Sequence, residues 1–219
     1  METITHNKYK VDHVRDLTDS TYVVRMERNG MEFQPGQNLN LGLAGDTEKR
    51  DYSIYSSDKD EFLEILVKEV DDGLVSKQLK RMNPGDSLEV DGPFGFFTIR
   101  EKDLDTRKFL FIASGTGVAP FHSITRSFPG INYKLLHGVR FANETYEKDH
   151  YDPDRYISCI SKEDGGSFKG RVTDYIKANP VDKQTLCYLC GNVNMIYDVF
   201  DILKEQGVPS ENLHAEVYF

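Results

Sequence analysis

Residues 109–120 read Phe-Leu-Phe-Ile-Ala-Ser-Gly-Thr-Gly-Val-Ala-Pro, and this stretch decides the second half of the fold. A continuous apolar run, a turn with two glycines and a helix-compatible segment up to Phe128 are typical of a buried parallel strand that leads into a helix. Further apolar strands are expected at Tyr133–Val139, Tyr156–Ile160 and Leu186–Leu189. Alternating strands and helices predict an α/β domain whose parallel sheet is covered on both faces and binds its ligand at the carboxyl ends of the strands.

Upstream of residue 100 the pattern is that of short antiparallel strands separated by turns. Apolar side chains largely alternate with polar or small ones at residues 38–43 and 63–68, which is the period of a strand with one buried face. Glycine and proline mark the turns, and residues 74–82 suit a short helix that caps one end of a barrel. We therefore predict an all-β antiparallel Greek-key barrel over residues 1–103, followed by the α/β domain over residues 104–219.

Composition argues against several classes of protein. The formal net charge of −9 is unlike that of a general nucleic-acid binder, and no apolar run approaches the roughly 20 residues that cross a bilayer. The first ten residues lack the apolar segment and cleavage site of a secretory signal, so we expect a cytoplasmic protein. The three cysteines offer no iron–sulfur spacing and the six histidines no metal-ligand spacing, so we expect no metal site.

Arg50, Tyr52 and Ser53 form the strongest local motif of the barrel half. On a strand, Arg50 and Tyr52 share one face, while Ser53 points to the other. Arginine can bind a phosphate bidentately, tyrosine can cover a ring system and a serine hydroxyl can bond to a ring nitrogen, so the set suits a flavin nucleotide. Taken alone, the motif fits an exposed edge strand of ordinary β-forming residues better.

Two motifs of the α/β half are equally weak by themselves. Gly115 and Gly117 allow close approach of the backbone to a diphosphate, but the turn lacks the third glycine of the dinucleotide fingerprint. Cys187 and Cys190 have the spacing of a redox dithiol, yet residues three apart on a strand point to opposite faces, so their sulfur atoms should diverge. Cys187 is then a small core residue.

Several short motifs in one order resemble the ferredoxin–NADP reductase family over nearly the whole chain. They are Phe33-Gln34-Pro35-Gly36-Gln37, Arg50-x-Tyr52-Ser53, Gly73-x-x-Ser76, Gly92-Pro93-x-Gly95, Gly115-Thr116-Gly117-Val118-Ala119-Pro120 and Cys190-Gly191-Asn192 with Met195. An ordered series, with each motif on the expected element, is more specific than any one motif. The resemblance implies that the barrel holds FAD, with FMN as the alternative flavin, and that the second domain binds NAD(P).

The same resemblance implies the contacts of the flavin. Arg50 would hold the flavin phosphate, Tyr52 would stack on the isoalloxazine ring and Ser53 would bond near N5, the hydride acceptor. The amides at the start of the short helix would bind the pyrophosphate, although Ser76 also fits a simple helix cap. The implied cofactor contacts are Arg50, Tyr52, Ser53, Ile54, Lys68, Val70, Gly73, Val75, Ser76, Thr116, Tyr218 and Phe219.

The resemblance further implies catalytic roles for Ser53, Cys190, Glu216 and Tyr218. Cys190 would face the nicotinamide, Glu216 would lie near the flavin, and Tyr218 would cover the ring where nicotinamide enters. The terminal aromatic residues suggest a docked final strand. Phe219 departs from relatives that stop at tyrosine, which leaves its contact open. NADPH is favoured over NADH, and the implied NAD(P) contacts are Gly115, Thr116, Gly117, Pro120, Arg140, Ser161, Lys162, Arg171, Cys190, Gly191, Asn192 and Met195.

The implied activity is hydride transfer between NADPH and flavin, followed by transfer of single electrons between flavin and a separate ferredoxin or flavodoxin. A basic face for docking an acidic ferredoxin would comprise Arg25, Arg28, Lys77, Lys80 and Arg81, although scattered surface charge fits these residues equally well. Two alternatives stay open. One is the reductase of a multicomponent oxygenase or a free-flavin reductase, and the other is a flavin-binding redox sensor or subunit without turnover.

Overall fold

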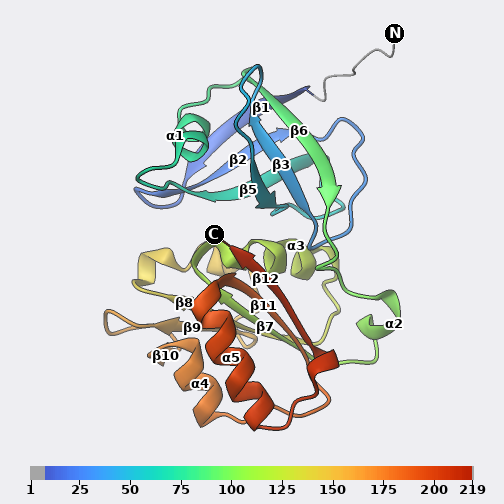
Figure 1. The fold of residues 1–219 in the computed structure, drawn as a ribbon, viewed down its shortest axis with the longest axis vertical. Coiled ribbons are helices and arrows are strands. Elements are labelled where there is room, and N and C mark those ends of the chain that lie inside the picture. The colour runs from blue at the N-terminus through green and yellow to red at the C-terminus, as the bar shows by residue number, and fades with distance from the viewer. Residues whose placement is uncertain (1–7, 219) are drawn as a thin grey trace. The chain divides into compact units, whose positions relative to one another are not determined.

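The computed structural model describes residues 8–218, and the chain divides into two compact units, Met1–Thr98 and Ile99–Phe219 (Figure 1). Phe219, whose flavin contact the sequence left open, lies outside the described residues. Among the helices of residues 8–218, none has the length and apolar character of a membrane span.

The first unit is an antiparallel sheet that closes on itself, as predicted. Its strand order is β4-β3-β6-β1-β2-β5, and the two outer strands meet through a bridge between Ile54 and Ile65. The Tyr55 amide donates to the Glu64 carbonyl at 2.7 Å beside this bridge, which completes the barrel. The strands are β1 (Lys8–Asp16), β2 (Thr21–Glu27), β3 (Asn38–Leu43), β4 (Arg50–Ser53), β5 (Phe62–Lys68) and β6 (Ser87–Phe94), and the predicted helix is α1 (Leu74–Lys80).

The second unit is a fully parallel sheet in the order β10-β9-β8-β7-β11-β12, which confirms the predicted α/β class. Its strands are β7 (Phe109–Ser114), β8 (Tyr133–Val139), β9 (Tyr156–Ile160), β10 (Phe168–Lys169), β11 (Leu186–Asn192) and β12 (Leu213–Tyr218). Its helices are α2 (Glu101–Leu104), α3 (Ala119–Ser127), α4 (Val172–Ala178) and α5 (Val193–Glu205). Single 3₁₀ turns lie at Gly115–Val118, Ala142–Glu144, Lys148–His150 and Ser210–Asn212.

The two faces of this sheet carry different side chains, because successive residues of a strand point to opposite sides. Leu110 and Ile112 of β7 belong to an aliphatic core with α4 and α5, which lie on one side of the sheet in Figure 1. Phe111 instead stacks on Phe121 of α3, with ring centroids 4.8 Å apart. Burial on both faces explains the continuous apolar run that the sequence shows at β7.

The chain ends in the predicted docked strand. β12 pairs in parallel with β11, so that Cys190 lies opposite Glu216 and Asn192 lies opposite Tyr218. The residues expected near the nicotinamide therefore occupy the carboxyl ends of two neighbouring strands.

Candidate functional site

The Arg50–Ser53 motif forms strand β4, whose exposure falls from Arg50 to the buried Ser53. Arg50 is exposed, and its guanidinium lies 3.0 Å from the Glu48 carboxylate. Tyr52 packs against the barrel core, and burial raises its pKa to about 12, an effect that the charge of Arg50 partly offsets. Tyr52 is therefore a neutral phenol at physiological pH, with its ring held by the barrel.

Ser53 carries a buried hydroxyl that the described chain leaves unsatisfied. The residue is only 3% exposed, and its Oγ has no hydrogen-bond partner among residues 8–218. A buried polar atom without a partner costs about 1–3 kcal/mol, so a native fold retains one mainly where a ligand or water completes it. The Ser53 hydroxyl is thus available to a polar atom of a bound molecule.

The loop before α1 is wound tightly around Ser76. The Val70 amide donates to Ser76 Oγ at 3.2 Å, and the Tyr22 hydroxyl donates to the Ser76 carbonyl. A Cβ on Gly73 would lie 2.7 Å from Ser76 Oγ, so a larger residue would force this loop apart. The Ser76 side chain therefore organises the loop instead of capping the helix, whose N-cap is Gly73. Lys68 and Val75 lie at the two ends of this loop.

The glycine turn after β7 contains one open glycine and one packed glycine. Gly115 has a φ of +54° and no atom within 4 Å of a Cβ built on it, so its surroundings are open to a ligand. A Cβ on Gly117, by contrast, would lie 2.3 Å from the Cys190 carbonyl oxygen. On the other strand, a Cβ on Gly191 would lie 2.3 Å from Ser114 Oγ, which accepts from the Asn192 amide at 2.9 Å.

Because of this packing, some of the predicted nucleotide contacts hold the protein together, whereas others line the turn where a nucleotide would bind. Gly117 and Gly191 let the ends of β7 and β11 approach, whereas Gly115 and Thr116 line the turn itself. The Asn192 side chain caps α5 by accepting from the amides of Asn194 and Met195, at 3.0 and 3.4 Å. Pro120 is buried in the first turn of α3, and Met195 packs against the aliphatic core.

His137 supports the turn from below, a role that sequence reasoning missed. It is fully buried in β8, with its Nε2 2.8 Å from the Gly115 carbonyl and its Nδ1 2.7 Å from the Tyr156 hydroxyl. A carbonyl only accepts, so Nε2 carries the proton and Nδ1 accepts from Tyr156. Burial lowers the pKa of His137 to about 4, although the bond to Gly115 favours the charged form. The sequence signal was a histidine that directly follows the two leucines of an expected strand.

Cys190 lies on β11, and Glu216 and Tyr218 lie on its neighbour β12. The Glu216 carboxylate is close enough to Cys190 to act on it electrostatically, and the Tyr218 hydroxyl acts on the thiol in the opposite direction. Burial, assisted by Glu216, raises the pKa of Cys190 well above its usual value, so the group is a neutral thiol. Cys187 belongs to the aliphatic core on the other face, and both thiols are free, which agrees with the predicted divergence of the two sulfur atoms.

Three predicted cations lie at the carboxyl ends of neighbouring strands. Arg140 follows β8 and donates to the Glu144 carboxylate through Nε and Nη2, at 3.2 and 2.6 Å. Lys162 follows β9 and donates its amide to the Arg140 carbonyl at 3.0 Å, while Arg171 precedes α4. Ser161, beside Lys162, bonds the Val139 carbonyl at 3.2 Å. The charge of Arg140 is thus already matched by a carboxylate.

Comparison with known proteins identifies the family. A family model described as an oxidoreductase FAD-binding domain matches residues 9–99, which is the barrel. Ferredoxin–NADP reductase B of Sorangium cellulosum is 31% identical over 220 residues, an alignment that covers 89% of this chain and 88% of the relative. The chain belongs to the ferredoxin–NADP reductase family. It is thus an oxidoreductase whose barrel is an FAD-binding domain.

Other similar proteins include the electron transfer component of an oxygenase and two reductases of known structure. The electron transfer component of a toluate 1,2-dioxygenase from Pseudomonas putida is 30% identical over 225 residues; the chain spans 66% of that relative. Among solved structures, a cytochrome P450 reductase from Amycolatopsis has a TM-score of 0.84 at 25% identity, covering 97% of this chain and 71% of that one. A ferredoxin NADP⁺ reductase from Neisseria gonorrhoeae with bound FAD and NADP has the same fold, with a TM-score of 0.84 at 22% identity and coverage of 97% and 98%.

The cations of the predicted ferredoxin-docking face are mostly engaged within the barrel unit of the reductase. Arg25 pairs with Glu64 at 2.9 Å, and Lys80 pairs with Glu69 at 2.9 Å. Backbone carbonyls accept from Arg28 and from Lys77. These contacts partly neutralise or fix the charges, so the structure favours the interpretation as surface charge over that of a ready docking face.

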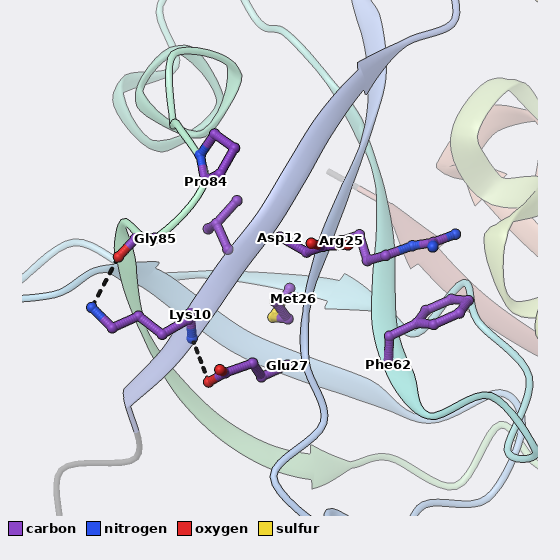
Figure 2. Close-up of a pocket in the computed structure, with 9 residues that line it drawn as sticks. Lys10, Asp12, Arg25, Met26, Glu27, Phe62, Pro84 and Gly85 are labelled. Carbon is purple, nitrogen blue, oxygen red and sulfur yellow. Dashed lines mark hydrogen bonds between the residues drawn. The ribbon is translucent and has the colours of Figure 1, made fainter.

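A cavity of about 550 Å³ lies elsewhere on the barrel, at the bulge of β1 (Figure 2). Its lining comes from β1, β2, Phe62 of β5 and the Pro84-Gly85 turn, with no residue of β4 or of the loop before α1. Lys10 closes one side of it by donating through Nζ to the Gly85 carbonyl at 2.9 Å. The cavity is therefore separate from the residues expected to hold flavin.

Protonation of His137 is expected to destabilise the folded reductase as the pH falls. Because burial lowers the pKa of His137 from 6.5 to about 4, the unfolded chain binds this proton more readily than the folded chain does. The contribution of neutral His137 to the free energy of unfolding is complete above about pH 6.5 and is lost towards pH 4. This contribution is at most about 3 kcal/mol.

The free energy of unfolding in urea, measured from pH 7 to pH 4, checks this expectation. His137→Gln should flatten the pH dependence, whereas His13→Gln, which alters an exposed histidine beside Asp12, should leave the slope unchanged. Equal slopes in wild type and His137→Gln would contradict the assignment of His137 as the titrating group.

Proposed function

We propose that this reductase transfers hydride between NADPH and its flavin, and single electrons between the flavin and a separate ferredoxin or flavodoxin. The observation that carries the proposal is the buried, unsatisfied Ser53 hydroxyl on a motif strand of the FAD-binding barrel. The relatives named as ferredoxin–NADP reductases support the choice of nucleotide and partner.

On the barrel, we assign the flavin phosphate to Arg50, which would exchange the Glu48 carboxylate for a phosphate. Both anions suit the planar guanidinium, so little rearrangement of the side chain is needed. Tyr52 would cover the flavin ring, and the Ser53 hydroxyl would form a hydrogen bond with a nitrogen of that ring. The loop wound around Ser76, from Lys68 to Val75, would receive the pyrophosphate, and Ile54 would contact the flavin beside Ser53.

A bound flavin would supply both two-electron chemistry towards nicotinamide and one-electron chemistry towards a protein partner. This chain's own residues would orient the reactants and keep water out. On the nucleotide side, the neutral Cys190 thiol and the Glu216 carboxylate would contact the nicotinamide. Tyr218, which lies on the strand next to that of Cys190, would cover the flavin ring and move aside when nicotinamide enters.

For the 2′-phosphate of NADPH, we assign the binding charge to Lys162 and Arg171 rather than to Arg140. Arg140 is already paired with Glu144 through two hydrogen bonds, so an incoming phosphate would compete with that carboxylate. Gly115 and Thr116 would approach the diphosphate.

A second candidate function is the reductase component of an oxygenase. The toluate dioxygenase component is nearly as similar to this chain as the ferredoxin–NADP reductase of S. cellulosum is, with 30% and 31% identity. In this alternative the two domains keep their roles, and only the electron acceptor differs.

Anaerobic mixing with NADPH tests the proposed function. The flavin absorbance near about 450 nm should bleach, because hydride transfer reduces the oxidised ring. Subsequent addition of a ferredoxin, a flavodoxin or an oxygenase component should restore the absorbance, and the fastest acceptor would separate the two candidates. A flavin that fails to bleach with either NADPH or NADH would favour a redox sensor without turnover.

Ser53→Ala is expected to slow flavin reduction by about tenfold, the effect of losing one hydrogen bond of about 1.4 kcal/mol, while flavin is retained. Stopped-flow reduction by NADPH measures the rate, and absorbance after gel filtration measures retention. Ser56→Ala is the matched control, because Ser56 is also buried but its Oγ accepts from the Glu64 amide within the barrel at 3.1 Å. Loss of flavin with a normal rate after resaturation would contradict the assigned role.

Arg171→Ala and Lys162→Ala are each expected to raise KM for NADPH by about tenfold, with little change in kcat or in KM for NADH, because each removes binding of a group remote from the reacting atoms. Lys169→Ala is the matched control, since Lys169 is exposed on the adjacent strand and pairs with Asp164 at 2.5 Å. Equal increases in KM for NADPH and for NADH would show that neither cation binds the 2′-phosphate.

A further inference from the structure

The fold brings together three metal-ligating side chains that lie far apart in the sequence. His122 belongs to α3, whereas Glu147 and His150 belong to the loop after β8, at the single 3₁₀ turn Lys148–His150. One ligand atom from each residue lies within 4.8 Å of the other two. The separation from His122 to Glu147 has no regular spacing, which is why the sequence predicted no metal site.

The distances within this cluster are close to those of a metal site. His122 Nε2 lies 2.9 Å from His150 Nδ1, which in turn lies 3.8 Å from Glu147 Oε2. Two ligands bound tetrahedrally at about 2.0–2.1 Å from zinc are separated by roughly 3.3 Å, so these two pairs need shifts of well under 1 Å to admit an ion, and the ligand atoms of His122 and Glu147 lie within 4.8 Å of each other.

The three ligands show a graded exposure that suits entry of an ion from solvent. His122 is fully buried, with its ring packed edge-on against Tyr151 at a centroid distance of 5.8 Å. The side chains of Glu147 and His150 are 12% and 46% exposed. The innermost ligand is thus held by packing, while the outermost is reachable from solvent.

The backbone holds Glu147 and His150 beside each other. Glu147 adopts a φ of +46°, a left-handed conformation that is uncommon outside glycine. The His150 amide then donates to the Glu147 carbonyl at 2.8 Å, which closes the turn. Unusual backbone of this kind is concentrated at ligand-binding sites.

We propose that His122, Glu147 and His150 form a binding site for a divalent transition-metal ion of the zinc class, with a fourth position open to water. Two imidazole nitrogens and one carboxylate oxygen suit zinc and its transition-metal neighbours, whereas magnesium and calcium prefer oxygen ligands alone. Three protein ligands with an open position are a recurrent zinc arrangement. Binding requires the donor nitrogen between the two imidazoles to lose its proton, and that proton is taken up at the other nitrogen of the same ring, so both histidines bind the ion as neutral imidazoles.

Calorimetric titration of the chelator-treated, flavin-loaded protein with zinc chloride tests the proposal. We expect one zinc ion per chain and no comparable binding of magnesium chloride. X-ray absorption at the zinc edge should show nitrogen and oxygen neighbours at about 2.0–2.1 Å and no sulfur at about 2.3 Å, which would distinguish this site from the cysteines.

Two variants and a control complete the test. His150→Ala and Glu147→Gln should each weaken zinc binding by about 100-fold or more, since loss of even an outer partner of a ligand typically costs 10- to 100-fold. His13→Ala, which removes an exposed histidine beside the Asp12 carboxylate, should leave the affinity unchanged. Absence of zinc binding, a zinc–sulfur distance, or unchanged affinity in both variants would overturn the proposal.

Discussion

The ends of β7 and β11 approach so closely that no side chain fits between them. A Cβ on Gly117 would lie 2.3 Å from the Cys190 carbonyl oxygen, and one on Gly191 would lie 2.3 Å from Ser114 Oγ. This contact holds the turn of Gly115 against the strand that carries Cys190, and β12 extends the same edge of the sheet with Glu216 and Tyr218. The nucleotide half of the reductase therefore depends on two positions where only glycine is compatible with the packing.

A second layer of contacts supports this turn from within the sheet. His137 donates to the Gly115 carbonyl and accepts from the Tyr156 hydroxyl, and the Tyr156 ring stacks on Tyr151 with centroids 5.1 Å apart. Tyr151 in turn packs against His122. A continuous series of buried polar and aromatic contacts thus joins the turn to the His122 cluster. These polar contacts lie on the face of the sheet that α3 covers, whereas the face covered by α4 and α5 is packed mainly with aliphatic side chains.

The barrel reaches its functional arrangement differently. Closure through Ile54 and Ile65 leaves Ser53 buried at the end of β4, directly before the bridge. Strand alternation puts Arg50 and Tyr52 on one face and the buried Ser53 on the other, so one short strand presents a charge and a ring on one side and a hydroxyl on the opposite side. The loop around Ser76 adds a second organised segment, because its backbone is held by the side chain of that serine.

The sequence by itself determined both fold classes, since each rests on local patterns. Alternation predicted the barrel strands, continuous apolar runs predicted the parallel sheet, and the ordered motifs from Phe33 to Met195 indicated the family. The same resemblance nominated Ser53 and Cys190. Only the tertiary structure decided which of these groups have partners: it left Ser53 Oγ without one among residues 8–218, paired Arg140 with Glu144, and gave Gly117 a packing role. It also revealed His137 and the His122, Glu147 and His150 cluster, because contacts between residues on different strands and loops depend on strand order and register, which no local pattern encodes.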